Sequence, residues 1–134
     1  METRCRIPAL AVEGGRRWPP RYAAGAMDSD YTPQQVAELI KQGDVQLIDV
    51  RETYEHEAGR IAGDRLIELM QLTAQAQTID RDRPVVFYCR SGSRSAMATQ
   101  AFRQAGYDAH NMAGGIIEWH AAGLPLEPAD GHVA

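Results

Sequence analysis

A short apolar run that ends in a cysteine constrains the fold of this chain more than any other stretch. Residues 84–88, Pro-Val-Val-Phe-Tyr, are rich in β-branched and aromatic side chains, which is typical of a buried strand. From residue 96 to residue 105 apolar side chains recur at helical spacing, and Gly106 follows where a helix ends. Residues 89–95 are therefore predicted to be a loop that joins a buried strand to a helix.

This predicted loop has the composition of an anion-binding site. A loop that leads onto a helix N-terminus directs several unpaired backbone N–H groups into one small concave region. Arg90 and Arg94 add positive charge, and Gly92 permits a tight turn with positive φ. The hydroxyl groups of the loop belong to Ser91, Ser93 and Ser95. We therefore expect the substrate to be a small anion.

Cys89 is the first residue of the loop. Helix N-termini and neighbouring arginines lower the pKa of a thiol from about 8.5 into the range of roughly 3.5 to 7.5, so we expect a thiolate at neutral pH. The alternative is that Cys89 is a small core residue, as buried free cysteines often are. The arginines, the glycine and the serines in the six positions that follow favour the nucleophile.

The segment Cys-Arg-Ser-Gly-Ser-Arg, residues 89–94, resembles the active-site loop of rhodanese-type sulfurtransferases. In that family the cysteine accepts a sulfane sulfur as a persulfide. Four residues separate Cys89 from Arg94, as in the six-residue rhodanese loop, whereas cysteine phosphatases have five. A smaller loop fits one added sulfur atom better than a phosphoryl or arsenate group. Sulfur transfer is thus favoured over a cysteine phosphatase or an arsenate reductase.

A second polar motif closes the apolar run 45–50, which has the length of a buried strand. Asp49 and Arg51 stand at its end. The positions that continue the pattern are Glu55, Gly59, Ile61 and Gly63. This pattern also resembles the rhodanese family, in which Asp-x-Arg at a strand end precedes a glutamate and then Gly-His-Ile-x-Gly.

The resemblance implies that Asp49 and Arg51 support the site, and two roles are open for Asp49: it caps a nearby turn, or it orients the active-site loop. For Arg51 and Glu55 a structural role is favoured. The match to the family pattern is partial. The departures are His56 for an aromatic residue, Arg60 for the histidine, and Ala62 and Asp64 for proline and alanine. Arg60 either pairs with Asp49 or faces water.

The remaining segments fit an α/β domain. Residues 32–35, Thr-Pro-Gln-Gln, form a capping box that begins a helix, and Gly43 ends it. Further predicted elements are a short strand at 66–67, a helix over 68–77 with Met70 in the core, a strand within 107–112, and a helix after Gly114-Gly115 with Trp119 in the core. The alternation predicts a three-layer α/β domain. The resemblance specifies a rhodanese-like fold with a central, mainly parallel sheet and helices on both faces.

The composition indicates one domain with flanking segments. The 134 residues provide a single core, and 44% are hydrophobic. Residues 1–27 are predicted to be a flexible basic extension, since residues 1–26 carry five arginines against two glutamates. One hypothesis is that Met27 is the physiological start, so that the extension is not native. Residues 28–127 form the predicted rhodanese domain, and residues 128–134 are predicted to be a loose tail.

Charge and residue counts exclude several classes of function. The net charge of −4 argues against general nucleic-acid binding, and the two cysteines, Cys5 and Cys89, are too few for a disulfide framework. The histidines lack metal-ligand spacing; they are His56, His110, His120 and His132. The short apolar piece 7–12 does not fit a secretory signal. We therefore expect a cytoplasmic protein without metal, cofactor, nucleic-acid or membrane partner.

The function that the resemblance implies is sulfur transfer through a Cys89 persulfide. Cys89 is then the catalytic residue, and the substrate-binding residues are Arg90, Ser91, Gly92, Ser93 and Arg94. The donor is thiosulfate or a similar small anion, and the acceptor is cyanide, a small thiol or a protein thiol. The alternative is a persulfide carrier or regulatory binding module that acts on a protein partner.

Overall fold

The computed structural model describes residues 30–134. The strands are β2 (Asp30–Tyr31), β3 (Gln46–Asp49), β4 (Arg65–Leu66), β5 (Val85–Tyr88) and β6 (Ala109–Met112). The helices are α2 (Pro33–Gln42), α3 (Thr53–Ala58), α4 (Leu72–Gln75), α5 (Ser93–Gln104) and α6 (Gly115–Ala121), with the 3-10 turns η2 (Leu69–Gln71) and η3 (Ala76–Thr78). The predicted extension 1–27 and its hypothetical start at Met27 lie outside the described residues.

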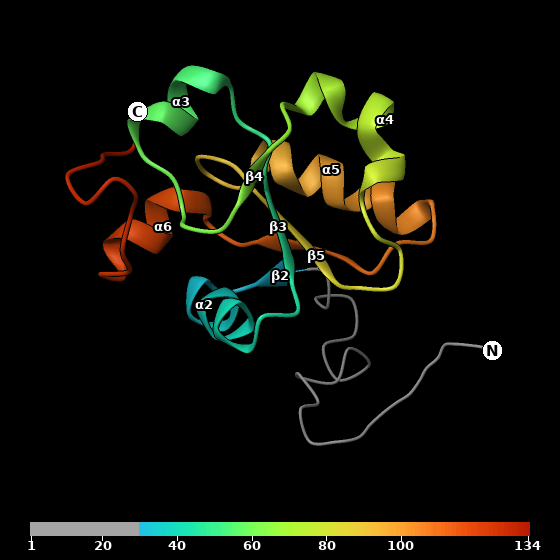
Figure 1. The fold of residues 1–134 in the computed structure, drawn as a ribbon, viewed down its shortest axis with the longest axis horizontal. Coiled ribbons are helices and arrows are strands. Elements are labelled where there is room, and N and C mark those ends of the chain that lie inside the picture. The colour runs from blue at the N-terminus through green and yellow to red at the C-terminus, as the bar shows by residue number, and fades with distance from the viewer. Residues whose placement is uncertain (1–29) are drawn as a thin grey trace.

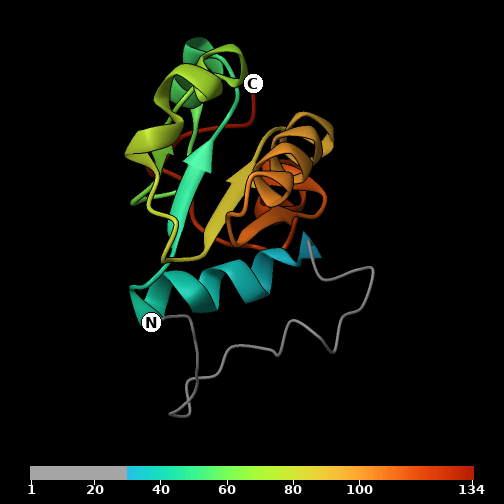
Figure 2. The same cartoon turned by 90° about the vertical axis from the view of Figure 1, so that its right-hand side faces the viewer.

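The strands form one sheet in the order β2-β6-β5-β3-β4, and each neighbouring pair is parallel. Strands β3 and β5 are adjacent and in register, so that Asp49 lies opposite Tyr88 where both strands end. Figure 2 shows their arrows pointing the same way, toward the end of the molecule where α3 lies. In parallel α/β sheets this carboxyl edge is where ligands bind.

Side chains of β5 alternate between two apolar clusters, because successive residues of a strand face opposite sides. Val85, Phe87 and Cys89 pack on the side covered by α5 and by the segment from η2 to η3. Val86 and Tyr88 pack on the side covered by α2 and α6. Figure 1 shows these two sets of helices on opposite sides of the sheet. The predicted three-layer architecture with a parallel sheet is confirmed.

The first described helix begins as its sequence predicts. The Thr32 hydroxyl accepts a hydrogen bond from the Gln35 N–H at 3.1 Å, and the Gln35 side chain accepts one from the Thr32 N–H at 2.9 Å. Pro33 follows the cap, and the helix ends at Gly43. The predicted core position of Trp119 is likewise confirmed, because this side chain is buried and its indole N–H donates to the Pro125 carbonyl.

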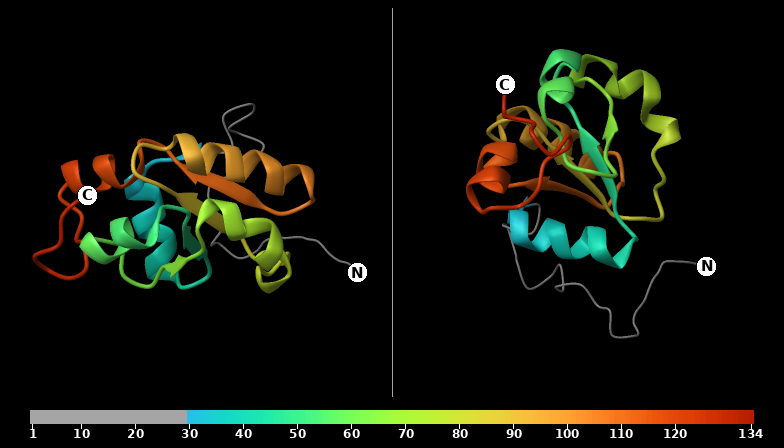
Figure 3. Two further views of the ribbon diagram at one scale, coloured as in Figure 1. Left: turned by 90° about the horizontal axis from the view of Figure 1, so that it is seen from above. Right: turned by 60° about the vertical axis from the view of Figure 1, so that its left-hand side comes forward.

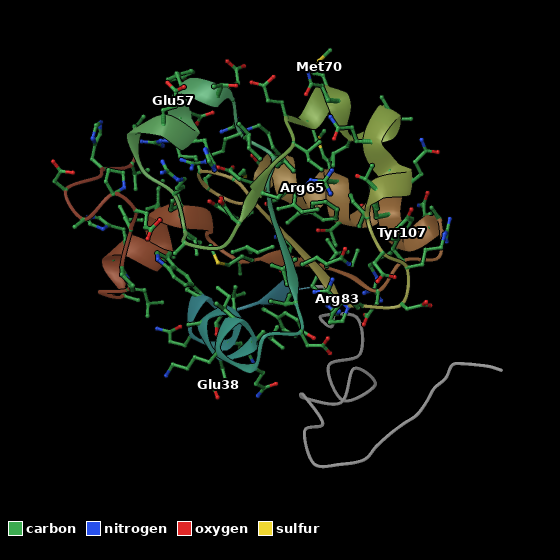
Figure 4. All side chains as sticks on the ribbon, viewed as in Figure 1. Glu38, Glu57, Arg65, Met70, Arg83 and Tyr107 are labelled. Atoms are coloured by element: carbon green, nitrogen blue, oxygen red, sulfur yellow. The ribbon has the colours of Figure 1, made fainter. Side chains whose placement is uncertain are left out.

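Residues 68–77 differ from the single helix that the sequence predicts. They form η2, α4 and the start of η3, with Leu72 buried. The Thr78 hydroxyl donates to the Gln75 carbonyl, and Arg65 donates to the Thr78 hydroxyl, so side-chain bonds stabilise the turns. The prediction that Met70 packs in the core is wrong: it is 93% exposed and points away from the protein in Figure 4. Apolar spacing alone does not show which side of a broken helix faces the sheet.

Residues 128–134 also differ from the loose tail that the sequence predicts. The His132 N–H donates to the Ala58 carbonyl at 2.9 Å, and Val133 packs against the cluster on the α2 and α6 side. These contacts are long-range in sequence, so local composition gives no signal for them. Within residues 30–134, no helix combines the length and the apolar character needed to cross a membrane.

Candidate active site

Cys89 follows β5 directly, and the chain then turns into α5 through a tight loop. The sulfur accepts a hydrogen bond from the Gly92 N–H at 3.0 Å. Gly92 has a φ of 105°, in the left-handed region that glycine adopts without strain, and it immediately precedes α5. Cys89 is fully buried and packs in an apolar cluster, so it is a core residue whose sulfur also accepts hydrogen bonds from the loop.

The donors around the sulfur favour the thiolate form of Cys89. Burial by itself raises the pKa of the Cys89 thiol, but the Ser95 hydroxyl and the backbone N–H groups of Ser95, Gly92 and Arg94 outweigh it. The pKa therefore lies below its ordinary value. Hydrogen bonds to a charged form favour that form. The sequence analysis predicts that the helix N-terminus and the arginines lower this pKa. In the structure, the causes of the lowered pKa include hydrogen-bond donors of the loop.

Ser95 connects the sulfur to the neighbouring strand β6. Its hydroxyl lies 3.4 Å from the Cys89 sulfur, 3.3 Å from the Gly92 carbonyl and 2.5 Å from Oδ1 of Asn111. A hydroxyl has one proton, so these three acceptors compete for it. Asn111 is oriented by its other amide atom, which donates to Asp30 at 3.3 Å.

The N-terminus of α6 orients the loop from the opposite side. The N–H groups of Ile116 and Ile117 donate to the carbonyls of Cys89 and Arg90, at 2.9 and 3.1 Å. The approach is so close that a Cβ atom on Gly115 would lie 2.4 Å from the Arg90 oxygen. Gly115 therefore permits a contact that draws the loop carbonyls toward α6. Sequence reasoning assigned Gly114-Gly115 only to the start of a helix and missed this role.

The two loop arginines have different surroundings. Arg94 donates from both terminal nitrogens to the Glu55 carboxylate, at 2.9 and 3.1 Å. Burial raises the pKa of Glu55, but the bonds from Arg94 and the Glu52 backbone lower it overall, so the pair is ionised. The Glu55–Arg94 pair ties α3 to the loop. Sequence reasoning favoured a structural role for Glu55 but did not identify Arg94 as its partner.

Arg90, Ser91 and Ser93 lie on the exposed side of the loop. The Arg90 Nε donates to the main-chain oxygen of Ala134 at 3.0 Å. Of the predicted substrate-binding residues, the structure thus places Gly92 on the sulfur, Arg94 on Glu55 and Arg90 at the surface beside the chain end.

Asp49 and Arg51 form a closed pair at the end of β3. The Asp49 carboxylate accepts two bonds from Arg51 Nε and one at 2.7 Å from Nη2, and both side chains are fully buried. It also accepts the Arg51 N–H, which is the turn-capping arrangement. Arg51 Nη2 continues to the Gly59 carbonyl. Arg60 instead donates to the His56 carbonyl at 3.3 Å.

Two departures from the family pattern contact one another. His56 Nε2 lies 3.1 Å from Asp64 Oδ1, and the Tyr88 hydroxyl donates to Asp64 Oδ2 at 2.6 Å. Burial raises the pKa of Asp64, although both partners act in the opposite direction. Because Tyr88 precedes Cys89, this network stabilises the end of β5.

Among residues 30–134, one group of side chains could hold a metal ion. Asp49, His56 and Asp64 each offer a ligand atom, and these atoms lie within 4.8 Å of one another. Both Asp49 oxygens already accept bonds from Arg51, and both Asp64 oxygens are paired with His56 and Tyr88. A guanidinium on a ligand carboxylate disfavours a cation there, so we assign no metal to this group.

Comparison with known proteins identifies the family of this chain. Residues 32–122 match the family model described as Rhodanese-like domain. A sulfurtransferase of Allochromatium vinosum is 36% identical over 106 residues, which cover 78% of this chain and 96% of that protein. The thiosulfate sulfurtransferase GlpE of Actinobacillus succinogenes is 31% identical over 109 residues, which cover 77% and 94% of the two chains.

Solved structures show the same fold. The crystal structure of a rhodanese-related protein from Thermoplasma volcanium is similar, with a TM-score of 0.68 and 30% identity over 72% of this chain and 95% of that one. The family match extends over strands β3 to β6, the cysteine loop and α6, and it ends before residues 127–134. On this evidence, the chain belongs to the family of rhodanese-like domains.

Proposed function

We propose that this protein is a sulfurtransferase that carries a sulfane sulfur on Cys89. The observation that carries the proposal is the set of donors at the Cys89 sulfur, namely the Gly92 N–H and the Ser95 hydroxyl, which favour a reactive thiolate. The donor is thiosulfate or a similar small anion. The acceptor is cyanide, a small thiol or a protein thiol. The protein acts in a reducing setting such as the cytoplasm.

In the first step the Cys89 thiolate attacks the outer sulfur of thiosulfate. A sulfur–sulfur bond forms on Cys89, the sulfur–sulfur bond of thiosulfate breaks, and sulfite leaves with the electron pair. The product is a persulfide anion on Cys89. Backbone N–H groups of the loop can stabilise the negative charge on the sulfur while it moves outward.

In the second step the acceptor attacks the outer sulfur of the persulfide. Cyanide takes that sulfur as thiocyanate, or a thiolate takes it as a new persulfide, and the electron pair of the broken bond returns to Cys89. The enzyme ends as it began, so the reaction is ping-pong and its two steps call for no added oxidant or reductant.

Arg90 is the better candidate for attracting the anionic donor. The charge of Arg94 is balanced by Glu55 in a two-point ion pair. Arg90 is exposed, and its Nε donates to the main-chain oxygen of Ala134. Arg90 is therefore the arginine whose terminal nitrogens are not both engaged by Glu55, and we propose that it attracts the dianion.

The test is the intact mass of the full-length protein before and after thiosulfate, without reductant and with peptide mapping. We expect a gain of one sulfur atom on Cys89, its removal by cyanide, and no gain in Cys89→Ser. If Cys89 gains no sulfur while it can still be alkylated, thiosulfate is not its donor, and the proposed enzyme activity is wrong for this substrate. A rate that depends on an added protein acceptor would then favour the persulfide carrier.

A further inference from the structure

A chain of polar side chains runs from the Cys89 sulfur to the edge of the sheet. Its members are Ser95 in the first turn of α5, Asn111 in β6 and Asp30, which lies opposite Asn111 in the edge strand β2. Figure 3 shows α5 lying beside β6 in the view from above. Ser95 and Asn111 are buried, so their polar groups depend on one another for partners.

Asp30 fixes the direction in which the Asn111 amide points. An ionised carboxylate only accepts hydrogen bonds, so the Asn111 nitrogen faces Asp30, at 3.3 Å. The amide oxygen then faces the Ser95 hydroxyl, at 2.5 Å. Because an amide oxygen carries no hydrogen, the proton in this short contact comes from Ser95.

This contact engages a donor that the sulfur also needs. The Ser95 oxygen lies 3.4 Å from the Cys89 sulfur, and its hydroxyl has one proton. While that proton lies on Asn111, the hydroxyl turns its lone pairs toward the sulfur, where they can accept from a thiol. A thiolate is stabilised by the same hydroxyl only when the proton rotates from Asn111 to the sulfur.

We propose that Asn111 and the Cys89 sulfur compete for the Ser95 proton, and that Asp30 maintains this competition by fixing the Asn111 amide. Asn111 is thus a positioning residue: it holds the proton while the sulfur is neutral and releases it when negative charge develops there. In sulfur transfer, where the inference rests on the proposed function, this charge develops when the acceptor breaks the bond between Cys89 and the outer sulfur. The electron pair returns to Cys89, and the rotated hydroxyl stabilises the departing thiolate.

Other charged groups also act on the Cys89 sulfur, and the test keeps them unchanged. Within residues 30–134, those beside the loop are the pairs Arg94–Glu55 and Asp49–Arg51, together with Arg90, Asp30 and Glu118. Asn111→Leu removes the competing acceptor and alters none of these charges. Asn111→Val does the same with a smaller side chain that is favourable in a strand.

The test is the pH dependence of Cys89 alkylation by iodoacetamide in the full-length protein, with peptide mapping to separate Cys89 from Cys5. Iodoacetamide is neutral, so the rising limb of the rate follows the thiolate population. We expect both Asn111 variants to move this limb to lower pH by about half a unit to one unit, the effect of one hydrogen bond. In the Ser95→Ala background the same substitutions should not move the limb, because the proton for which the groups compete is absent.

The matched control for a disturbance of β6 is Met112→Leu. Met112 is the next residue of the strand, it packs in the cluster on the α2 and α6 side, and the substitution nearly conserves volume. This control should leave the limb in place.

Asp30→Ala tests the competition at an exposed position, where a substitution does not disturb the core. It frees the Asn111 amide to turn its nitrogen toward Ser95, so the limb should move to lower pH. The loss of the Asp30 charge acts in the same direction, but it acts whether or not Ser95 is present. The shift should therefore be larger in the unchanged chain than in the Ser95→Ala background.

Two outcomes would overturn the proposal. One is a limb that stays in place or moves to higher pH in the Asn111 variants. The other is an equal shift in the Ser95→Ala background, because Asn111 would then act on the sulfur without the Ser95 proton.

Single-turnover kinetics separate this inference from the proposed function. If Cys89 takes sulfur from thiosulfate, release of that sulfur to cyanide should be about twofold faster in Asn111→Leu, since a thiolate of lower pKa leaves more readily. Slower release would contradict the inference. If no persulfide forms at all, the proposed function fails, and the alkylation limb still decides whether Asn111 competes for the proton.

Discussion

The loop after β5 and the segment after β3 lie side by side at the carboxyl edge of the sheet. Their polar groups are arranged in different ways. After β5, N–H groups and a hydroxyl converge on the Cys89 sulfur. After β3, the charges of Asp49 and Arg51 are buried against one another. Donors gathered around one acceptor favour its anionic form, whereas a carboxylate and a guanidinium in two-point contact balance each other's charge. Neighbouring strand ends can therefore present one acceptor surrounded by donors and one closed ion pair.

The largest effect should follow from replacing the nucleophile. We expect Cys89→Ser to lower sulfur transfer by about 10³-fold or more, since a hydroxyl at this position is not ionised. Stability should change little, because the two side chains have similar volumes. The measurement is the rate of thiocyanate formation together with a urea unfolding curve. Substantial remaining turnover would place the chemistry outside the loop.

The next largest effect should come from the support side of the comparison. Asp49→Ala leaves the Arg51 guanidinium buried without its carboxylate, which should lower the free energy of unfolding by about 3–5 kcal/mol. The double variant Asp49→Ala/Arg51→Met should recover much of this loss, because it removes the unpaired charge. Urea unfolding measures both. If Asp49→Ala kept its stability and lost activity, Asp49 would belong to the chemistry instead of the support.

A smaller effect should follow at the contact between α3 and the loop. Glu55→Gln removes the charge that holds Arg94, so the loop should be less ordered and kcat/KM should fall by about tenfold. The matched control is Glu57→Gln, an exposed position on the same helix that Figure 4 labels. Equal effects of the two substitutions would mean that net charge, and not the Glu55–Arg94 pair, governs the rate.

The smallest effect should concern the pH dependence of Cys89. The thiolate is the reactive form and is populated above the pKa of the thiol, so a lowered pKa extends reactivity to lower pH. Ser95→Ala removes one of the groups that lower the pKa, and the rising limb of the alkylation rate should move to higher pH. Thr99→Val removes a buried hydroxyl of the same helix that donates to the Ser95 carbonyl, and it should not move the limb. A shift to lower pH in Ser95→Ala would contradict the assigned role of the hydroxyl.

The predicted three-layer fold and the predicted strand-to-helix loop at Cys89 depend on local signals, and these were sufficient. The capping box at Thr32, the apolar run before Cys89 and the glycines that end helices each act through residues a few positions apart. Met70 shows where local signals end. Its spacing fits a helix against the sheet, but the helix is broken at that point and the side chain faces solvent.

The predicted site was less complete, because its partners come from distant parts of the chain. Glu55 and Arg94 are 39 residues apart, and Ser95 and Asn111 are 16 apart. Neither pair has a spacing that periodicity can detect. Arg90 and Arg94 are alike as loop residues, and the structure distinguishes them, because Arg94 donates to the Glu55 side chain and Arg90 to the main-chain oxygen of Ala134.

The sequence by itself determined the α/β layers, the position of Cys89 at the end of a buried strand and the basic loop that follows it. Propensity, capping and strand length act over short stretches and are written in neighbouring residues. Only the tertiary structure decided that Glu55 engages Arg94, that α6 approaches the loop through Gly115, and that the last residues contact Arg90. These contacts exist because packing the sheet and its helices brings distant segments together, and burial then requires each polar group to find a partner.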